Sequence, residues 1–247
     1  MSTAADVRAA LAESADPADA VHLQRFFKTG PGEYGEGDVF IGVRVPATRQ
    51  VVKRFRGLDP GEIEVLLDSE VHEHRLAAVL LLVAAYPKDP DAVFVQYLAA
   101  VARGRVNNWD LVDASAGHIV GRHVRTGRAP ASLLDELAAS PDLWERRVGV
   151  LATFDFITHG DAGPALRLAG ALLGDRHDLI QKATGWMLRE TGKRVSPGVL
   201  TGFLDAHAAE MPSTMLSYAT EHLTPEQRAH YRALRGRARR GSRAVAR

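Results

Sequence analysis

The sequence predicts an all-α fold of the α-α superhelix, or solenoid, kind, in which pairs of helices stack on one another. Apolar residues recur with helical periodicity in almost every segment, and no segment shows the alternation typical of a half-buried strand. Proline occupies plausible first helical positions, as in Asp16-Pro17, Asp59-Pro60 and Ser196-Pro197. Similar blocks of sequence also recur at a regular spacing, which indicates a repeat architecture.

The expected helices follow one another along most of the chain. Val45-Pro46 and Ser140-Pro141 add two further proline start signals. Glycine readily adopts the left-handed conformation that ends a helix, and the stops expected on this ground are Gly57, Gly127, Gly160 and Gly174. The periodicity predicts helices over residues 3–14, 17–28, 46–57, 60–68, 72–86, 88–103, 108–124, 130–138, 141–159, 161–174, 178–193, 197–208, 213–220 and 224–236.

Four blocks align when the chain is shifted by about 36 residues, a repeat length typical of helical solenoids. They are Glu73–Ala78, Trp109–Ala114, Glu145–Val150 and Gln181–Trp186. Each opens a long helix that a second, antiparallel helix follows, which is the pattern of HEAT-like repeats with one continuous core. A plain helical bundle without repeats is the alternative. In a solenoid the first turns of successive long helices would line one concave surface, bringing together Trp109, Asp113, Arg147, Lys182 and Trp186.

Composition points to an ordinary globular protein. Of the 247 residues, 46% are hydrophobic and 25% are charged. The lack of cysteine excludes disulfides, thiolate metal sites and cysteine nucleophiles, and it suits a reducing cytoplasm. The N-terminus lacks the features of a signal peptide, and the longest apolar run, Leu76–Tyr86, is shorter than the ~20 residues that span a bilayer. We therefore expect a soluble cytoplasmic protein without membrane contact. We also expect it to be a monomer.

We expect a single domain over residues 1–236, because no linker rich in proline, glycine or serine divides the chain. The net charge of +1 says nothing about nucleic acid, but arginines concentrate near the end of the chain. Residues 237–247 form a basic tail that we expect to be disordered. This tail either contacts phosphates or only aids solubility.

Residues 29–45 are the exception to helix. Within them, Gly30–Gly35 matches the spacing of the dinucleotide-binding fingerprint. No strand precedes that segment, and neighbouring acidic residues would repel a pyrophosphate, so the match is accidental. We interpret the stretch as an ordered loop that delivers Arg44 and the following helix.

The segment Asn107–Asp113 has the features of a helix start. Asparagine side chains can accept hydrogen bonds from the first N–H groups of a helix, and Asp110 suits the positive end of the helix dipole. Trp109 and Asp113 are four residues apart and therefore share one helix face, where a π face and a carboxylate together suit a cation. A half-buried tryptophan beside a capping acid is the alternative interpretation.

Arg146 and Arg147 also stand near a helix start, where positive charge opposes the dipole. They require a compensating anion, which is either an internal acid, such as Glu145 or Asp142, or an external phosphate. Both interpretations stay open on spacing alone.

Trp186 lies within a helix, where core packing is the default interpretation. Gly185 before it would let another backbone or a ligand approach closely. We predict no metal site, because His72 and His74 are two residues apart and face different sides of their helix. No nucleotide-binding, zinc-protease or calcium-loop motif is present either.

Several segments together resemble one family. They occur in order between about Arg25 and Ala219 and comprise Phe26–Asp38 with Gly42–Pro46, Asn107–Asp113, Trp144–Arg147, Gln181–Glu190 and Met211–Leu216. These segments are similar to those of DNA alkylation repair proteins of the AlkD type. The resemblance implies HEAT-like repeats that form a cationic concave groove for duplex DNA containing alkylated bases.

The same resemblance implies a monofunctional glycosylase that removes N3- and N7-alkylated purines with the base still stacked. Asp113 matches the catalytic aspartate of the family, and Trp109 and Trp186 match its active-site tryptophans. Arg147 matches a phosphate-contacting arginine, whereas Phe26 replaces a tyrosine found in some members, so one hydroxyl contact is lost. Some relatives lack glycosylase activity, so the fold alone does not fix the function.

From these matches we expect DNA contacts from Arg146, Lys182 and Arg44 as well, no cofactor, and a location at the nucleoid. Alkylation at N7 or N3 makes the purine a cationic leaving group, and bond cleavage moves positive charge onto the deoxyribose. Asp113 would stabilise that charge, and the tryptophan π faces would attract the cationic nucleotide. The alternatives are a non-catalytic DNA-structure binder and a protein-binding scaffold. Whether the lesion is a simple methylpurine or a bulky adduct stays open.

Overall fold

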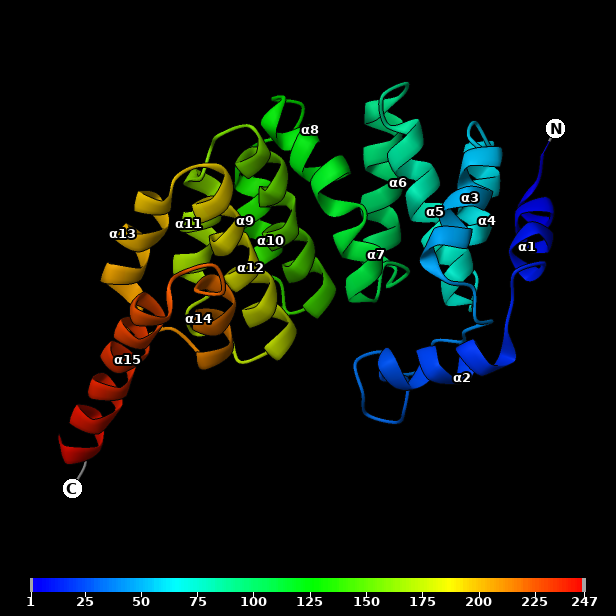
Figure 1. The fold of residues 1–247 in the computed structure, drawn as a ribbon. Coiled ribbons are helices and arrows are strands. Elements are labelled where there is room, and N and C mark those ends of the chain that lie inside the picture. The colour runs from blue at the N-terminus through cyan, green and yellow to red at the C-terminus, as the bar shows by residue number, and fades with distance from the viewer. Residues whose placement is uncertain (1, 246–247) are drawn as a thin grey trace. The chain divides into compact units, whose positions relative to one another are not determined.

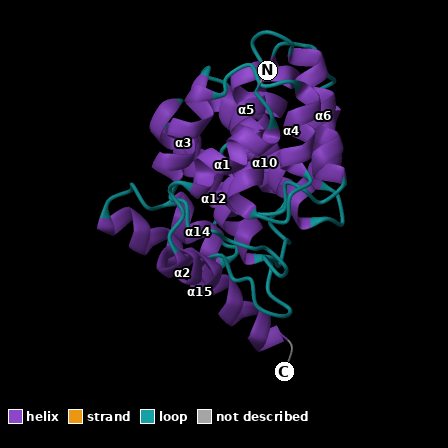
Figure 2. Ribbon diagram, turned by 90° about the vertical axis from the view of Figure 1, so that its right-hand side faces the viewer, coloured by secondary structure: helices purple, strands orange, loops and turns teal. Residues whose placement is uncertain are grey.

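The computed structural model describes the backbone of residues 2–245 and the side chains of residues 2–235. Within this part of the chain every regular element is a helix, as Figure 2 shows. The one β-type contact is an isolated bridge between Val39 and Val71, which ties the loop before α3 to the start of α5. The predicted all-α class is confirmed.

The chain divides into two compact units, Met1–His123 and Val124–Arg247. The helices of the first unit begin near the N-terminus, blue in Figure 1, and end at a short π-helical turn, η1. They are α1 (Ala4–Ala12), α2 (Pro17–Phe26), α3 (Val45–Arg54), α4 (Pro60–Leu67), α5 (His72–Ala85), α6 (Pro90–Ala102), α7 (Trp109–Asp113) and η1 (Gly117–Gly121).

The short helix α8 (Arg122–Arg125) contains the boundary between the units. The second unit then continues with helices of more regular length, except for the short α9 and α14. They are α9 (Ser132–Ala138), α10 (Leu143–Thr158), α11 (Gly163–Ala171), α12 (Asp178–Arg194), α13 (Pro197–His207), α14 (Ser213–Ala219) and α15 (Pro225–Val245).

Alternate helices contact one another in each unit, which is the neighbour pattern of stacked helical pairs. In the first unit, α3 contacts α1 and α5, and α5 contacts α7. In the second unit, α12 lies between α10 and α14, as Figure 1 shows, while α9 contacts α11. Fully buried leucines fill the space between the helices, such as Leu66 and Leu81 in the first unit and Leu188 and Leu204 in the second.

The helix boundaries follow the start and stop signals with two exceptions. Asp16, Asp59 and Ser196 each cap the helix that begins at the following proline. Pro141 is not the first residue of its helix, because Asp142 accepts hydrogen bonds from the N–H groups of Trp144 and Glu145 and α10 begins at Leu143. Gly174 does not act as the expected left-handed stop, because its φ is not positive, whereas Gly57, Gly127 and Gly160 have positive φ and follow the ends of their helices.

The continuous helix expected over residues 108–124 is broken into α7, η1 and α8. The N–H of Arg122 donates to the carbonyl of Gly117, five residues earlier, which is the bonding of a π-helix. The wide turn contains two glycines, which are poor helix formers, and periodicity alone does not reveal it.

Helix α15 carries helical backbone to Val245, into the basic tail expected over residues 237–247. The side chains of that tail, and residues 246–247 altogether, lie outside the described residues, so its role stays a prediction. In the described part of the chain, no helix is both long and apolar enough to cross a membrane.

Candidate functional site

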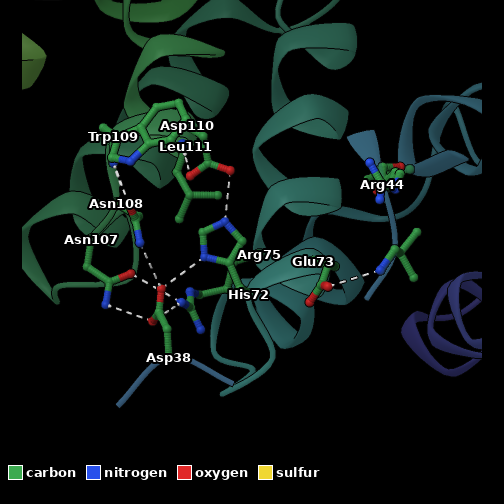
Figure 3. Close-up of polar contacts among 12 residues, drawn as sticks. Asp38, Arg44, His72, Glu73, Arg75, Asn107, Asn108, Trp109, Asp110 and Leu111 are labelled. Atoms are coloured by element: carbon green, nitrogen blue, oxygen red, sulfur yellow. Dashed lines mark hydrogen bonds and ion pairs between the residues drawn. The ribbon is translucent and has the colours of Figure 1, made fainter. Parts of the chain in front are cut away.

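The loop between α2 and α3 is held by a buried carboxylate at the start of α5. Glu73 accepts hydrogen bonds from the N–H groups of Ile41, Gly42 and Val43 at 2.8 to 3.1 Å. Figure 3 shows its side chain apart from the contacts of Asp38 and His72. Gly42 has a φ of +83°, and a Cβ there would lie 2.0 Å from the carbonyl oxygen of Asp16. These contacts fix the loop, as the sequence predicts.

A second buried carboxylate, Asp38, joins the same loop to two other segments. It accepts hydrogen bonds from Arg75 at 2.5 Å on α5, and from Asn107 at 3.4 Å and Asn108 at 3.2 Å before α7. Burial alone would raise the pKa of Asp38, but the hydrogen bond from His72 and the charge of Arg75 outweigh it, and the net pKa is lowered. Asp38 is therefore an ionised, buried junction.

His72, at the first position of α5, lies between two carboxylates (Figure 3). Its Nδ1 is 2.9 Å from Asp38, and its Nε2 is 2.8 Å from Asp110 on α7. The ring also stacks on Phe40, with centroids 4.4 Å apart. Burial by itself lowers the pKa of His72, but the charges and hydrogen bonds of Asp110 and Asp38 reverse this and raise the pKa to about 9.

Trp109 begins α7 and is half-buried. The side-chain oxygen of Asn108 accepts a hydrogen bond from the backbone N–H of Trp109 at 2.9 Å, so the predicted asparagine cap is confirmed. The indole stacks on Phe27 with centroids 5.0 Å apart and 14° between the ring planes. Phe26, which is 56% exposed, meets the indole edge-on at 5.9 Å. An aromatic surface open to solvent results.

Asp113 ends α7, four residues after Trp109, and is also half-buried. Between them, Leu111 and Val112 are fully buried. Burial raises the pKa of Tyr97, and the charge of Asp113 acts in the same direction. The tryptophan and the aspartate thus share one short helix that is fixed on its inner side.

A cavity of about 330 Å³ opens beside His72 and Asp110 within the first unit. Its lining is mainly apolar and includes Phe27 and Phe40, while His72, Glu73 and Asp110 contribute to its wall. The three polar side chains already have hydrogen-bond partners within the chain. The cavity therefore lies directly against the buried imidazole of His72.

In the second unit, Trp186 lies on α12 and is half-buried beside a charged cluster. Its Nε1 donates to Glu190 at 3.3 Å, and its ring lies 6.3 Å from that of Phe154. Glu190, only 4% exposed, also accepts hydrogen bonds from Arg189 at 3.2 Å and Arg194 at 2.7 Å. Burial would raise the pKa of Glu190, but these arginines lower it overall. Glu190 is therefore ionised beside the indole.

Gly185 lets another backbone approach, which is one of the two roles that the sequence allows. A Cβ at this position would lie 2.5 Å from the carbonyl oxygen of Met215 and 2.7 Å from Cβ of Tyr218, both on α14. Helices α12 and α14 therefore pack closely directly beside Trp186.

The two arginines at the start of α10 have partners inside the second unit. Arg147 is 5% exposed and donates to the carbonyl of Leu179 at 2.7 Å. Arg146 donates to Asp175 at 3.0 Å and to the carbonyls of Ser140 and Pro141. The internal acid that compensates Arg146 is thus Asp175, a residue that the sequence interpretation did not consider.

The other two predicted cations are also paired. Lys182 lies 2.6 Å from Asp178, one turn earlier on α12. Arg44 is exposed and makes two hydrogen bonds to Asp19, at 2.6 and 2.5 Å. Both pairs lie at the surface, where such ion pairs are weak and exchange readily with other anions.

The structure places Trp109 and Asp113 in the first unit, and Trp186, Arg147 and Lys182 in the second. Their predicted convergence on one surface stays a prediction. Sequence reasoning missed the bridge from Asp38 through His72, because these residues are far apart in the chain and His72 was tested only as a metal ligand. Within the described residues, no three histidine or acidic side chains are grouped so that they could hold a metal ion.

Comparison with known proteins identifies the family. A family model described as DNA alkylation repair enzyme matches residues 7–223. A solved structure described as a predicted DNA alkylation repair enzyme from Enterococcus faecalis is similar in fold, with a TM-score of 0.70 and 18% identity over 86% of this chain and 98% of that one. No curated protein matches significantly. Because the family model covers most of the sequence, the chain belongs to the DNA alkylation repair enzyme family.

Proposed function

We propose that this protein is a monofunctional DNA glycosylase that hydrolyses the N-glycosidic bond of cationic N3- and N7-alkylated purines in duplex DNA. Membership of the family supports a role in DNA repair. The observation that supports glycosylase activity is on the short helix α7, which holds both the Trp109 indole and the Asp113 carboxylate. Phe26 and Phe27 extend the indole into an aromatic surface.

The aromatic surface is suited to a cationic nucleotide. Phe27 supports the indole of Trp109 from behind, and Phe26 extends the surface toward solvent. A cation over an indole face gains ~1–2 kcal/mol once water is excluded. A neutral base gains little of this attraction, so the surface favours bases that alkylation has made positive.

The carboxylate is suited to the transition state. When the bond to an alkylated purine breaks, positive charge develops on the deoxyribose, and the purine leaves without needing a proton. A carboxylate at Asp113 would stabilise that charge and orient the attacking water. The buried residues Leu111 and Val112 fix the inner side of the same helix, which limits the movement of Asp113.

In this proposal Trp186 provides a second aromatic face, and Arg146, Arg147, Lys182 and Arg44 contact phosphates near the lesion. The surface pairs at Lys182 and Arg44 support such a role, since a phosphate can replace an exposed carboxylate partner. Arg147 is more deeply buried, so its contact would require an exchange of its internal hydrogen bond.

The decisive experiment combines one substitution with a set of lesions. Asp113→Asn removes the charge without changing the volume, so we expect excision of 7-methylguanine to fall to background while duplex binding stays within a few-fold of wild type. Glu136→Gln, at an exposed acid on α9, is the matched control and should be fully active. Single-turnover release and equilibrium binding are measured for both variants.

Wild type should release 7-methylguanine and 3-methyladenine and leave uracil in place, because uracil carries no charge. A bulky N7 adduct in the same set shows whether the lesion class extends beyond methylpurines. Comparable release of uracil would refute the mechanism, and excision by Asp113→Asn near the wild-type rate would refute the role of Asp113. Duplex binding without any release would indicate a DNA-structure binder.

A further inference from the structure

His72 lies between two carboxylates in a way that fixes its protonation state. Its two ring nitrogens are 2.9 Å from Asp38 and 2.8 Å from Asp110, and carboxylate oxygens can only accept hydrogen bonds when ionised. A neutral imidazole has one N–H and could satisfy only one of them. Both contacts are satisfied together when the ring is an imidazolium.

The charges around this ring balance. Asp38 and Asp110 are compensated by His72 and by Arg75, whose guanidinium also reaches Asp38 at 2.5 Å. The remaining charged groups nearby have their own partners. Glu73 accepts three backbone N–H groups, and Arg44, which lines the adjoining cavity, pairs with Asp19. The imidazolium is therefore the one link between Asp38 and Asp110 in the described contacts.

Helix α7 is too short to hold its own orientation, because it has only five residues and a π-helical turn follows closely. Its position depends on tertiary contacts, and two of them lead to His72. Asp110 accepts the hydrogen bond from Nε2, and Phe27 lies between the two rings, 5.1 Å from His72 and 5.0 Å from Trp109.

We propose that His72 is a positioning residue for the glycosylase reaction: its charged ring, held between Asp38 and Asp110, sets the orientation of α7 and so of Trp109 and Asp113. The proposal rests on the proposed function. His72 itself contacts neither the base nor the sugar. It acts through Asp110 on the backbone of α7 and through Phe27 on the indole.

Loss of the proton breaks one of the two hydrogen bonds and leaves a buried carboxylate facing a ring lone pair. The pKa of His72 is raised to about 9, so the bridge is complete at neutral pH and is lost as the pH rises through that value. His74, on the same helix, is a natural control, because it bonds to Ser69 and to neither of the two carboxylates, and its pKa is lowered to about 4 by burial and by Arg8 and Arg75.

The test compares His72→Gln with His74→Gln and wild type in single-turnover excision of 7-methylguanine between pH 6 and 10. For wild type and His74→Gln we expect a rate that falls with a midpoint near pH 9. For His72→Gln we expect a rate about 10- to 100-fold lower at neutral pH, because the catalytic groups on α7 are displaced. The rate of this variant should not decline near pH 9. Duplex affinity should stay within a few-fold of wild type.

A second readout does not depend on catalysis. With Trp144 and Trp186 replaced by phenylalanine, Trp109 is the one tryptophan left, and its emission reports the position of α7. We expect its spectrum to shift with a midpoint near pH 9, and the shift should disappear in His72→Gln. This readout needs no enzyme turnover. A shift in this variant, together with no excision of 7-methylguanine by the wild-type protein, would refute the proposed function and retain the bridge.

The proposal is overturned if His72→Gln shows the same high-pH decline as wild type, or if Trp109 emission is unchanged over this range. It is also overturned if His72→Gln lowers the melting temperature while its rate and pH profile, measured well below that temperature, match those of wild type. The wild-type pH titration remains decisive even if His72→Gln fails to fold.

Discussion

Trp109 and Trp186 each lie near a buried carboxylate, and the two carboxylates are held in different ways. Near Trp109, Asp38 receives hydrogen bonds from side chains far away in sequence, on α5 and before α7. Near Trp186, Glu190 receives them from its own helix, from Trp186, Arg189 and Arg194. The first carboxylate joins separate segments of the chain, whereas the second braces one helix.

This difference determines what each carboxylate contributes. Among the described contacts, loss of Asp38 would leave Asp110 as the one carboxylate beside two buried cations, His72 and Arg75, and would remove the loop's contacts to Asn107 and Asn108 before α7. Loss of Glu190 would leave Arg194 partly exposed and Arg189 still paired with Glu221, so water and a second acid can take over. A carboxylate that joins distant segments should therefore matter more for folding than one that braces a single helix.

The largest expected effect is on stability. Asp38→Ala should lower the free energy of unfolding by about 3–5 kcal/mol, because it leaves buried charges uncompensated. Glu190→Ala should lower it by about 1–2 kcal/mol. Urea unfolding followed by circular dichroism measures both. Equal losses of unfolding free energy for the two variants would contradict the distinction between a carboxylate that joins distant segments and one that stabilises a single helix.

A smaller effect is expected at Gly185, where the second unit relies on close backbone packing. Gly185→Ala places a Cβ 2.5 Å from the carbonyl oxygen of Met215, so α12 and α14 must separate, at a cost of about 1–3 kcal/mol. Gly202→Ala, on α13, is the control, because a Cβ at this position would have no atom within 4 Å. It should be neutral or slightly stabilising. Similar melting temperatures for the two variants would show that the contact beside Trp186 is easily relieved.

The smallest expected effect is on the affinity for duplex DNA when Arg147 is replaced. Arg147→Ala should weaken binding to damaged and undamaged duplexes alike, since a phosphate contact carries no base information. The slope of log affinity against log salt should decrease by roughly one counterion. Arg167→Ala, at an exposed pair with Asp135, is the control and should keep the full slope. An unchanged slope with reduced stability would show that Arg147 acts inside the protein, where it donates to the Leu179 carbonyl, and contacts no phosphate.

Local signals in the sequence predict most of the fold. Helical periodicity and proline starts give nearly every helix within a few residues, because these signals act over one or two turns. The segment before Trp109 is also predicted well, down to the asparagine that caps it. Pattern reasoning fails at the break after α7, where two glycines permit a wide turn but do not require it.

The polar cluster could not be predicted because it depends on three segments meeting. From the sequence pattern alone, Asp38 is an acidic loop residue and His72 is a lone histidine at a helix start. Only the fold brings them together with Asp110. The cations at α10 show the same limit, since the partner of Arg146 is Asp175, which is distant in sequence.

The π-helical turn at Gly117–Gly121 has a consequence for insertions and deletions. A π-helical turn accommodates one residue more than an α-helical turn, and each residue of an α-helix advances by about 100°. The hydroxyl of Ser115 donates to Tyr97 on α6, which fixes the angular position of the chain just before the turn. Deleting one residue within the turn would convert it to regular helix and leave the angular position of α8 nearly unchanged, because the wide turn absorbs the extra residue, and α7 and its tryptophan would keep their place. Natural variation in length should therefore be tolerated there sooner than within α7.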